Sequence, residues 1–323
     1  MKLSFDVMGH EGKLSDAIKA ARKFCEKHKD AEIVLVGAKH LITPLIKPNE
    51  FVIHDCPDTI KMTDSPLNAL RKVNSSMYQA MQLVADHKTD GVFSAGSTQC
   101  FVSLVYYLIK PIKKELKPCF LPFIPTLKGT ATGVCDVVAQ INCDGKDLYN
   151  FAKMTKIFFE FVLKRTRPTI GLINIGTEEC KGYDYHKQAH QLLLNDQSFN
   201  YVGFVEPRYL FDGIVDIAVC DGYTGNLVIK SIEGGAKAVS SAFKTQYKKP
   251  WNWLGALFSL IGIVKVKKTF DYRNHAGAVV LGINAPAVKT HGSADFKQFY
   301  SGLNTLYDLV KSNVIDKIKK EFQ

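Results

Sequence analysis

The segment Ile217–Asn226 constrains the fold more than any other stretch of the chain. Its first four residues are apolar and uncharged, which is typical of a short, fully buried strand. Asp221 and Gly222 then end the strand, and Thr224 or Asn226 caps a following helix. A strand, a glycine-containing turn and a helix are how α/β proteins present backbone N–H groups to an anion. An ordinary turn between a strand and a helix has the same pattern, so this stretch leaves both interpretations open.

The same succession of buried strand, small-residue turn and amphipathic helix recurs along the chain. Short apolar runs predict further strands at 3–5, 32–37, 51–53, 92–93, 119–122, 133–138, 169–173 and 278–282. Helical spacing of apolar residues predicts helices at 17–24, 75–85, 101–108, 148–162, from the central turn to 247, and 296–314. This alternation predicts an α/β protein, and 323 residues suffice for one large domain or two smaller ones.

Polar residues follow several of the predicted strands. The small and hydroxyl residues of Ser94–Thr98 suit a phosphate, although a plain turn would look the same. Asn174, Gly176 and Lys181 lie in a loop after another strand, where Lys181 would neutralise an anion or serve as a surface lysine. His291 follows the last strand, where a lone histidine is more often structural than catalytic.

The net charge limits which partners the chain would attract, and the cysteine pattern limits which kinds of site and compartment suit it. The net charge of +11 would attract an acidic protein, a membrane face, a phosphorylated ligand or nucleic acid. No nucleic-acid recognition motif accompanies the basic residues, so we expect no nucleic-acid partner. The eight cysteines form no Cys-x-x-Cys pair, and no histidine spacing resembles a zinc site, so we expect no metal. Reduced thiols and the short apolar segment at the N-terminus favour a cytoplasmic protein without a signal peptide.

Residues 251–264 depart from the α/β pattern. Large apolar residues repeat at helical spacing between flanking lysines, but fourteen residues are too few to cross a bilayer. These features suit a helix lying in a membrane interface, and equally a helix packed in the core or a dimer interface. The predicted membrane contacts are Trp251, Trp253, Leu254, Leu257, Phe258 and Ile261.

A series of short motifs, each weak alone, resembles one family in order and spacing. As they stand in this sequence, they are Asp6-Val7-Met8-Gly9, Asn74-Ser75-Ser76-Met77, Ser94-Ala95-Gly96, Asn174-Ile175-Gly176, Glu179 with Lys181-Gly182, Cys220-Asp221-Gly222 with Thr224-Gly225-Asn226, and Lys289 with His291-Gly292. Together they resemble the bacterial acyl-ACP:phosphate acyltransferases of phospholipid synthesis, the PlsX family. The match runs from Asp6 to His291, which is nearly the whole chain.

Some positions differ from the family's usual pattern. His10 and Glu11 stand where Gly and Asp are usual, and Ser97 and Gln99 replace Asn and Gly; Val138, Gln140 and Asn142 replace a Gly, an Asn and an Asp. The resemblance leaves open what those side chains do in this chain. Because the later motifs remain, we expect a diverged enzyme and not an inactive one.

The resemblance implies a three-layer α/β/α sandwich similar to the isocitrate and isopropylmalate dehydrogenases. We expect one domain over 1–323 with a protruding helical segment at about 232–270, usually in a homodimer, without a cofactor. The implied reaction transfers a long-chain acyl group from acyl carrier protein to inorganic phosphate, giving acyl phosphate. The implied enzyme is cytoplasmic and attaches peripherally to an anionic membrane surface.

The resemblance also implies the site residues. The predicted catalytic residues are Lys181, Asn226 and His291. The predicted substrate or phosphate contacts are Asp6, Gly9, Asn74, Ser75, Ser94, Gly96, Ser97, Thr98, Asn174, Gly176, Asp221, Gly222, Thr224, Gly225, Lys289 and Gly292. Backbone donors are expected at Gly96, Gly176 and Gly225. Phosphate is itself the nucleophile, so positioning and oxyanion stabilisation are the main tasks.

Two other classes remain open. An enzyme similar to phosphotransacetylase would use acyl-CoA with the same fold and phosphate chemistry. A non-catalytic peripheral membrane adaptor would explain residues 251–264 and the departures from the motifs. Comparing acyl-CoA with acyl-ACP as substrates separates the two enzymes, whereas the adaptor would bind liposomes and make no acyl phosphate.

Overall fold

A computed structural model describes residues 1–247, 249, 251, 259, 262, 265 and 277–323. The chain divides into two compact units, each assembled from separate stretches of sequence. Unit 1 comprises Met1–Pro122, Asn150–Pro168 and Arg273–Gln323, and unit 2 comprises Phe123–Tyr149 and Thr169–Tyr272. The chain therefore leaves unit 1 and returns to it twice.

Unit 1 is built on a seven-stranded sheet with the order β3-β2-β1-β4-β12-β11-β5. Its strands are β1 (Lys2–Asp6), β2 (Glu32–Gly37), β3 (Val52–Asp55), β4 (Gly91–Ser94), β5 (Cys119–Leu121), β11 (Ala278–Leu281) and β12 (Ala287–Lys289). The run from β3 to β12 is parallel, whereas β11 pairs antiparallel with both β12 and β5. Apolar residues fill the central strands, as expected for a sheet covered on both faces.

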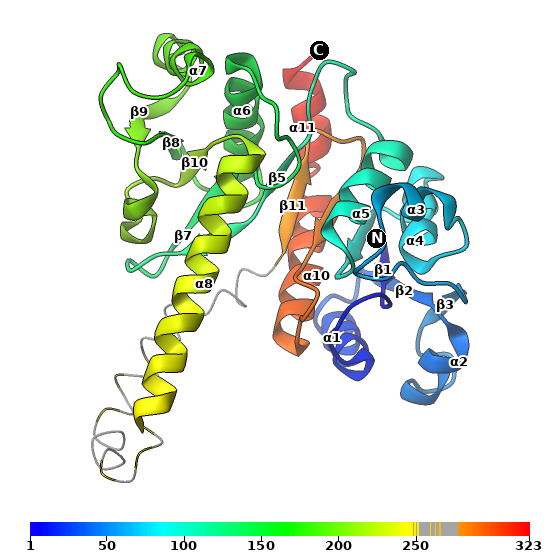
Figure 1. Cartoon of the computed structure of the whole chain (residues 1–323). Helices are drawn as coiled ribbons and strands as arrows, with labels where there is room; N and C mark the ends of the chain where they lie inside the picture. Colours follow the sequence, from blue (N-terminus) through cyan, green and yellow to red (C-terminus); the bar gives the residue numbers. More distant parts are fainter. Residues whose placement is uncertain (248, 250, 252–258, 260–261, 263–264, 266–276) are drawn as a thin grey trace. The chain divides into compact units, whose positions relative to one another are not determined.

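Helices cover this sheet (Figure 1). They are α1 (Leu14–Lys27), α2 (Lys39–Ile42), α3 (Pro66–Arg71), α4 (Ser76–Ala85), α5 (Thr98–Leu104), α10 (Phe296–Lys311), α11 (Val314–Glu321) and, from Asn150 on, α6 (Gly145–Phe161). Helix α1 packs against α10, and α4 packs against β1, β2 and β4. The rings of Phe5, Phe93 and Phe299 meet in the core, with centroids 5.0–6.5 Å apart. Each such buried side chain stabilises the fold by roughly 1.5–3 kcal/mol.

The strand order of unit 1 reverses direction beside β1. The chain steps outward from β1 to β2 and β3, and then returns to place β4 on the other side of β1. In open parallel sheets, ligands bind at the carboxyl ends of the strands where this reversal occurs. In unit 1 those ends are Asp6 and Ser94, which are register partners.

Unit 2 has a five-stranded sheet with the order β6-β7-β10-β8-β9. Its strands are β6 (Phe123–Pro125), β7 (Ala131–Cys135), β8 (Thr169–Ile173), β9 (Asn200–Val205) and β10 (Ile217–Val219), and its helices are α7 (Asp184–Asn195) and α8 (Gly222–Tyr247). All neighbours are parallel except β6 and β7. The carboxyl ends of β7, β10 and β8 therefore lie side by side at one edge of this sheet.

Helix α8 packs against unit 2 in its first half and is exposed in its second half. Val228, Ile229 and Ile232 pack against the core of unit 2, whereas residues 234–246 are exposed throughout (Figure 1). This exposed half covers the start of the protruding segment predicted from the sequence. Of the predicted membrane contacts, Trp251 is 78% exposed; Trp253, Leu254, Leu257, Phe258 and Ile261 lie outside the described residues. Within the described part of the chain, no helix is both long and apolar enough to cross a membrane.

The α/β class and the predicted strands are confirmed, with shifts of one or two residues at most ends. The structure adds β6, β9, β12, α2, α3 and α7, which the sequence pattern did not resolve. The last predicted helix is two helices, because Asn313 adopts a left-handed conformation with φ of 52° between α10 and α11. Asparagine tolerates that conformation better than most residues.

Candidate functional site

The predicted site residues gather at the carboxyl edges of the two sheets. In unit 1 they are Asp6, Gly9, Asn74, Ser75, Ser94, Gly96, Ser97, Thr98, Lys289, His291 and Gly292. In unit 2 they are Asn174, Gly176, Lys181, Asp221, Gly222, Thr224, Gly225 and Asn226. We call these two sets the unit 1 corner and the unit 2 corner.

A buried carboxyl group organises the unit 1 corner. Asp6 ends β1 and is 1% exposed. Ser94 Oγ donates to Asp6 Oδ2 over 2.7 Å, and the Met8 amide donates to Oδ1 over 3.2 Å. Burial raises the pKa of Asp6 to about 6, while hydrogen bonds from Ser76, Ser94 and Met8 act in the opposite direction. Asp6 thus fixes the direction of the Ser94 hydroxyl and lies too deep to meet a ligand directly.

The Ser94 hydroxyl also determines what Gly96 does. Because its hydrogen points to Asp6, Ser94 Oγ accepts a hydrogen bond from the Gly96 amide over 3.1 Å. The expected backbone donor at Gly96 is therefore already used within the chain. A side chain at Gly96 would overlap the methyl end of Met77, so the backbone approaches α4 closely here.

Lys289 ends β12, and His291 follows it by two residues. Lys289 is the register partner of Ser94 and is 6% exposed, so it places an ammonium group among the strand ends. His291 is exposed, and its Nδ1 lies 2.8 Å from Ser293 Oγ. Gly292 accepts a hydrogen bond from the Glu11 amide, which joins this loop to the one after β1. A buried lysine next to hydroxyls is suited to a phosphate group.

Ser75 lies between α3 and α4. It occupies the N-cap position of α4, but its side chain does not cap the helix. Its hydroxyl donates instead to the Lys72 carbonyl over 2.7 Å. Asn74 is exposed beside it, whereas Ser97 is buried at the start of α5.

In the unit 2 corner, the turn at Ile217–Asn226 has its amides occupied. The Gly222 amide donates to the Gln140 carbonyl over 2.7 Å, and the Gly225 amide donates to the Asp221 carbonyl over 2.9 Å. The Thr224 amide donates to Asp221 Oδ1 over 2.9 Å. These amides are therefore used within the chain, as in an ordinary turn between a strand and a helix.

Carboxylates occupy the place at the start of α8 where an anion was expected. Asp221 also accepts hydrogen bonds from the hydroxyls of Thr224 and Tyr185, over 2.7 and 3.2 Å. Burial, reinforced by Asp221, raises the pKa of Tyr185, so this phenol stays protonated as a donor. Asp136 is fully buried beside the turn and accepts from the Gln140 amide over 2.6 Å. An acidic group at a helix N-terminus is favourable, and it disfavours a second anion there.

The loop after β8 holds its own residues in place. Asn174 donates through Nδ2 to the Lys181 carbonyl over 3.1 Å and accepts from the Ile175 amide over 2.9 Å. Lys181 lies over Gly176 and pairs with Glu178 at 2.8 Å, with both side chains well exposed. The Glu178 carboxylate raises the pKa of Lys181, which keeps its charge. Asn226 is half-buried on α8.

Sequence reasoning missed several residues that build these corners. Asp136, Tyr185 and Lys72 were not singled out, because no sequence pattern shows which groups their side chains contact. Asp136 carried one signal, since it lies within a predicted buried strand, 133–138, near the ligand-binding edge. Among the described residues, no cluster of three or more His, Cys, Asp or Glu could hold a metal ion.

Comparison with solved structures identifies the fold. A phosphotransacetylase from Streptococcus pyogenes aligns with a TM-score of 0.61 at 15% identity, over 98% of this chain and 94% of that one. A 4-hydroxythreonine-4-phosphate dehydrogenase from Klebsiella pneumoniae aligns with a TM-score of 0.56 at 10% identity, over 96% and 99%. The fold is therefore that of an α/β protein with two sheets rich in parallel strands, as in these enzymes.

Sequence comparison then gives the family. Residues 1–317 match the family described as "Fatty acid synthesis protein", and the chain belongs to this family. A protein of Malacoplasma penetrans named "Phosphate acyltransferase" is 45% identical over the whole of this chain and 98% of its own length. A protein of Ureaplasma parvum with the same name is 43% identical over 99% of this chain and 97% of its own.

Proposed function

We propose that this chain is a phosphate acyltransferase that makes acyl phosphate from long-chain acyl-ACP and inorganic phosphate, for phospholipid synthesis. The observation that carries the proposal is the full-length similarity to relatives bearing that name, within a fatty acid synthesis family. The resemblance of the ordered motifs to the acyl-ACP:phosphate acyltransferases adds acyl carrier protein as the acyl donor. The reaction forms a C–O bond to phosphate and breaks the thioester C–S bond, and the leaving thiolate takes up a proton.

Lys289 is the residue that we assign to phosphate in the unit 1 corner. Its place at the end of β12, in register with Ser94, supports this role, because it puts a positively charged side chain at the strand ends that form the corner. His291, on the same loop, is assigned to the thioester oxyanion or to phosphate. In the unit 2 corner, Lys181 and Asn226 keep their proposed substrate contacts. The side chains of Asp221, Thr224 and Asn174 support the local backbone.

The proposed reaction requires little of the protein beyond positioning the acyl group and phosphate. Phosphate is the nucleophile, so no serine or cysteine nucleophile is needed. A thiol leaving group with a pKa near ~8.5 departs without a strong acid. Donors placed where charge develops on the thioester oxygen therefore supply most of the rate enhancement.

The proposed setting of the enzyme follows the same resemblance. A net charge of +11 supports recruitment of an acidic carrier protein. The exposed half of α8 and Trp251 support a homodimer and contact with an anionic membrane surface from the cytoplasm. We further propose that the two units form one α/β/α domain of the isocitrate and isopropylmalate dehydrogenase type.

A second candidate is an acyl-CoA-dependent enzyme, which the fold shared with phosphotransacetylase favours. The test incubates purified protein with phosphate and either long-chain acyl-ACP or acyl-CoA, and traps acyl phosphate with hydroxylamine. Product from acyl-ACP alone supports the proposal, and product from acyl-CoA alone supports the alternative. Absence of product from both, with folded protein that binds liposomes, would favour a non-catalytic adaptor.

Variants test the phosphate assignment. Lys289→Ala is expected to lower kcat/KM for phosphate by at least about 10²-fold, the scale of losing one charged donor in an active site. Lys19→Ala, an exposed lysine on α1 of the same unit, serves as the matched control. Lys181→Ala and His291→Ala complete the series. Normal turnover and normal phosphate affinity in both would contradict their assignment.

A further inference from the structure

The loop between β3 and α3 lies against the unit 1 corner. A Cβ atom at Gly9 would come 2.5 Å from the Ile60 carbonyl oxygen, and one at Gly292 would come 2.8 Å from the Met62 methyl group. The loop therefore packs against the turns that follow β1 and β12. We call residues 58–65 the cover loop. It forms one wall of the corner that contains Lys289.

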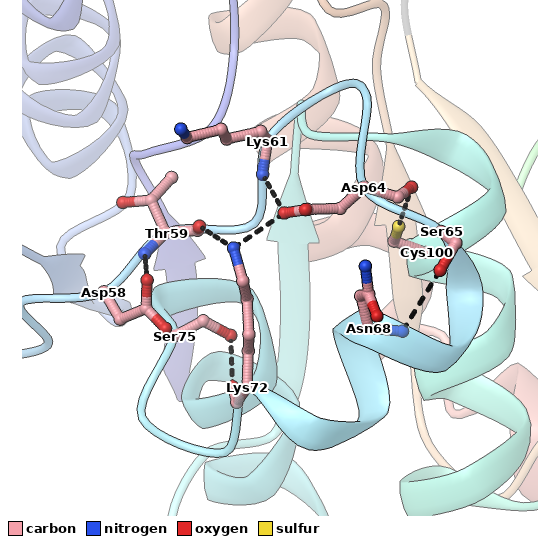
Figure 2. Close-up of polar contacts among 9 residues, drawn as sticks. All are labelled: Asp58, Thr59, Lys61, Asp64, Ser65, Asn68, Lys72, Ser75 and Cys100. Atoms are coloured by element: carbon pink, nitrogen blue, oxygen red, sulfur yellow. Dashed lines mark hydrogen bonds and ion pairs between the residues drawn. The ribbon is translucent and has the colours of Figure 1, made fainter.

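A single lysine ties the two ends of the cover loop together (Figure 2). Lys72 Nζ donates to the Thr59 carbonyl over 3.1 Å and to Asp64 Oδ2 over 2.8 Å. The Lys61 amide donates to the same Asp64 oxygen over 2.7 Å. The Lys72 ammonium group and the Asp64 carboxylate thus hold the two ends of the cover loop together. We call this pair of side chains the clamp. Both side chains are largely shielded from solvent, at 28% and 15% exposure.

The lysine is itself anchored to the site motifs. The Ser75 hydroxyl donates to the Lys72 carbonyl (Figure 2). The Ser76 amide donates to the Asp58 carbonyl over 3.1 Å. On the other side, Cys100 Sγ of α5 donates to the Asp64 carbonyl over 3.2 Å. The Asn74-Ser75-Ser76 motif therefore supports the clamp. This gives the Ser75 hydroxyl a role that no helix cap accounts for.

The cover loop brings one apolar side chain to the corner. Met62 is 40% exposed and lies beside Gly292, next to the loop that carries His291. Ile60 is fully buried and holds the loop to the core. A partly exposed methionine adapts its shape to flexible apolar groups, such as the methylene chain of a fatty acyl substrate.

We propose that Lys72 is a positioning residue that, through Asp64 and Thr59, holds the cover loop so that Met62 contacts the acyl chain at the unit 1 corner. The proposal rests on the acyl transfer proposed above and adds which segment recognises the acyl group. An acyl contact misplaced by 1 Å weakens binding, while the groups that act on phosphate stay in place. Loss of the clamp should therefore act mainly on KM for the acyl donor.

The main test measures kcat and KM separately with acyl-ACP of several chain lengths. Lys72→Gln is expected to raise KM for acyl-ACP about tenfold and to change kcat less than about threefold, with a flatter chain-length preference. Lys72→Arg, which keeps both donated bonds, should restore KM. Lys88→Gln is the matched control, because Lys88 also pairs with an aspartate in unit 1 but lies away from the loop, on the surface. Unchanged KM and chain-length preference in Lys72→Gln would overturn the proposal.

Two further variants keep the test decisive. Asp64→Ala should reproduce Lys72→Gln, and the double variant should be no worse than either, because both remove one interaction. Met62→Ala should shift chain-length preference while the loop stays closed. Hydrogen exchange at the Lys61 amide reports closure directly and needs no activity. If the wild type makes no acyl phosphate, the proposed function fails. Unaltered exchange in Lys72→Gln would separately show that the clamp does not hold the loop.

Discussion

The two corners look alike in sequence and differ in structure. Each has a buried strand, a turn of small residues and a helix. In unit 2, the turn is closed by its own acceptors, and Gly225 lies directly against the Asp136 carbonyl oxygen. In unit 1, the atom that a side chain at Gly96 would overlap is the flexible methyl end of Met77, and a separate loop tied by Lys72 and Asp64 packs beside the corner. Similar turns thus differ in what closes them: backbone atoms lie against the glycine in unit 2, whereas the end of a flexible side chain lies against it in unit 1.

Adding one methyl group to each turn gives the largest expected contrast. Gly225→Ala should lower the free energy of unfolding by more than about 3 kcal/mol, because backbone must move to admit the methyl group. Gly96→Ala should cost less than about 1 kcal/mol, since the Met77 side chain can rotate away. Urea denaturation measures both. Gly234→Ala, in the open half of α8, should instead gain up to about 1 kcal/mol. Equal costs for Gly225→Ala and Gly96→Ala would remove the distinction between the corners.

The raised pKa of Asp6, a residue of unit 1, predicts that the stability of the protein depends on pH. The folded state binds its proton more tightly than the unfolded state, so stability is fully present below pH 3.8 and falls as pH rises to about 6. The free energy of unfolding of the wild type, taken relative to that of Asp6→Asn, should fall by about 3 kcal/mol between pH 3.5 and pH 7. Asp30→Asn is the control of opposite sign, because the Tyr307 hydroxyl lowers the pKa of Asp30. A difference between wild type and Asp6→Asn that does not vary with pH would refute the shift.

The cap at the start of α8 predicts an intermediate effect in unit 2. Asp221→Ala should destabilise the protein by about 2 kcal/mol, because the Thr224 amide loses its acceptor at a helix N-terminus. Asp221→Asn keeps a side-chain acceptor and should cost less than half as much. Thermal unfolding of the three proteins checks the order. If Asp221→Ala were as stable as the wild type, the carboxylate would be a ligand group and not a cap.

The smallest effect is expected at Val138, which stands where the family usually has a glycine. It adopts φ of 80°, a conformation costly for a β-branched residue. In Val138→Gly, relief of roughly 1–3 kcal/mol of strain offsets the lost contacts, so stability should change by less than about 0.5 kcal/mol. The neighbouring Val137 is buried with an ordinary backbone, and Val137→Gly should cost about 3 kcal/mol. Comparable losses at both positions would mean that Val138 is unstrained.

The sequence located the corners but not their internal contacts. Alternation of strands and helices placed Asp6, Ser94, Asn174 and Asp221 at strand ends, because the periodicity of burial is local information. The acceptors of Gly222 and the clamp at Lys72 depend on segments brought together only by the fold. Ser75 shows the limit well, since its hydroxyl donates to the Lys72 carbonyl, a contact that no motif in the sequence indicates.

The strand order of unit 1 also dictates when that unit can be finished during synthesis. β12 fills the position between β4 and β11, and β5 reaches the sheet only through β11. The ribosome must therefore make all of unit 2 before the nascent sheet of unit 1 can close. At roughly 5–20 residues per second, the edge of β4 waits unpaired for on the order of 10 s. An open strand edge invites pairing with other chains, so this interval is when the newborn protein most needs a chaperone.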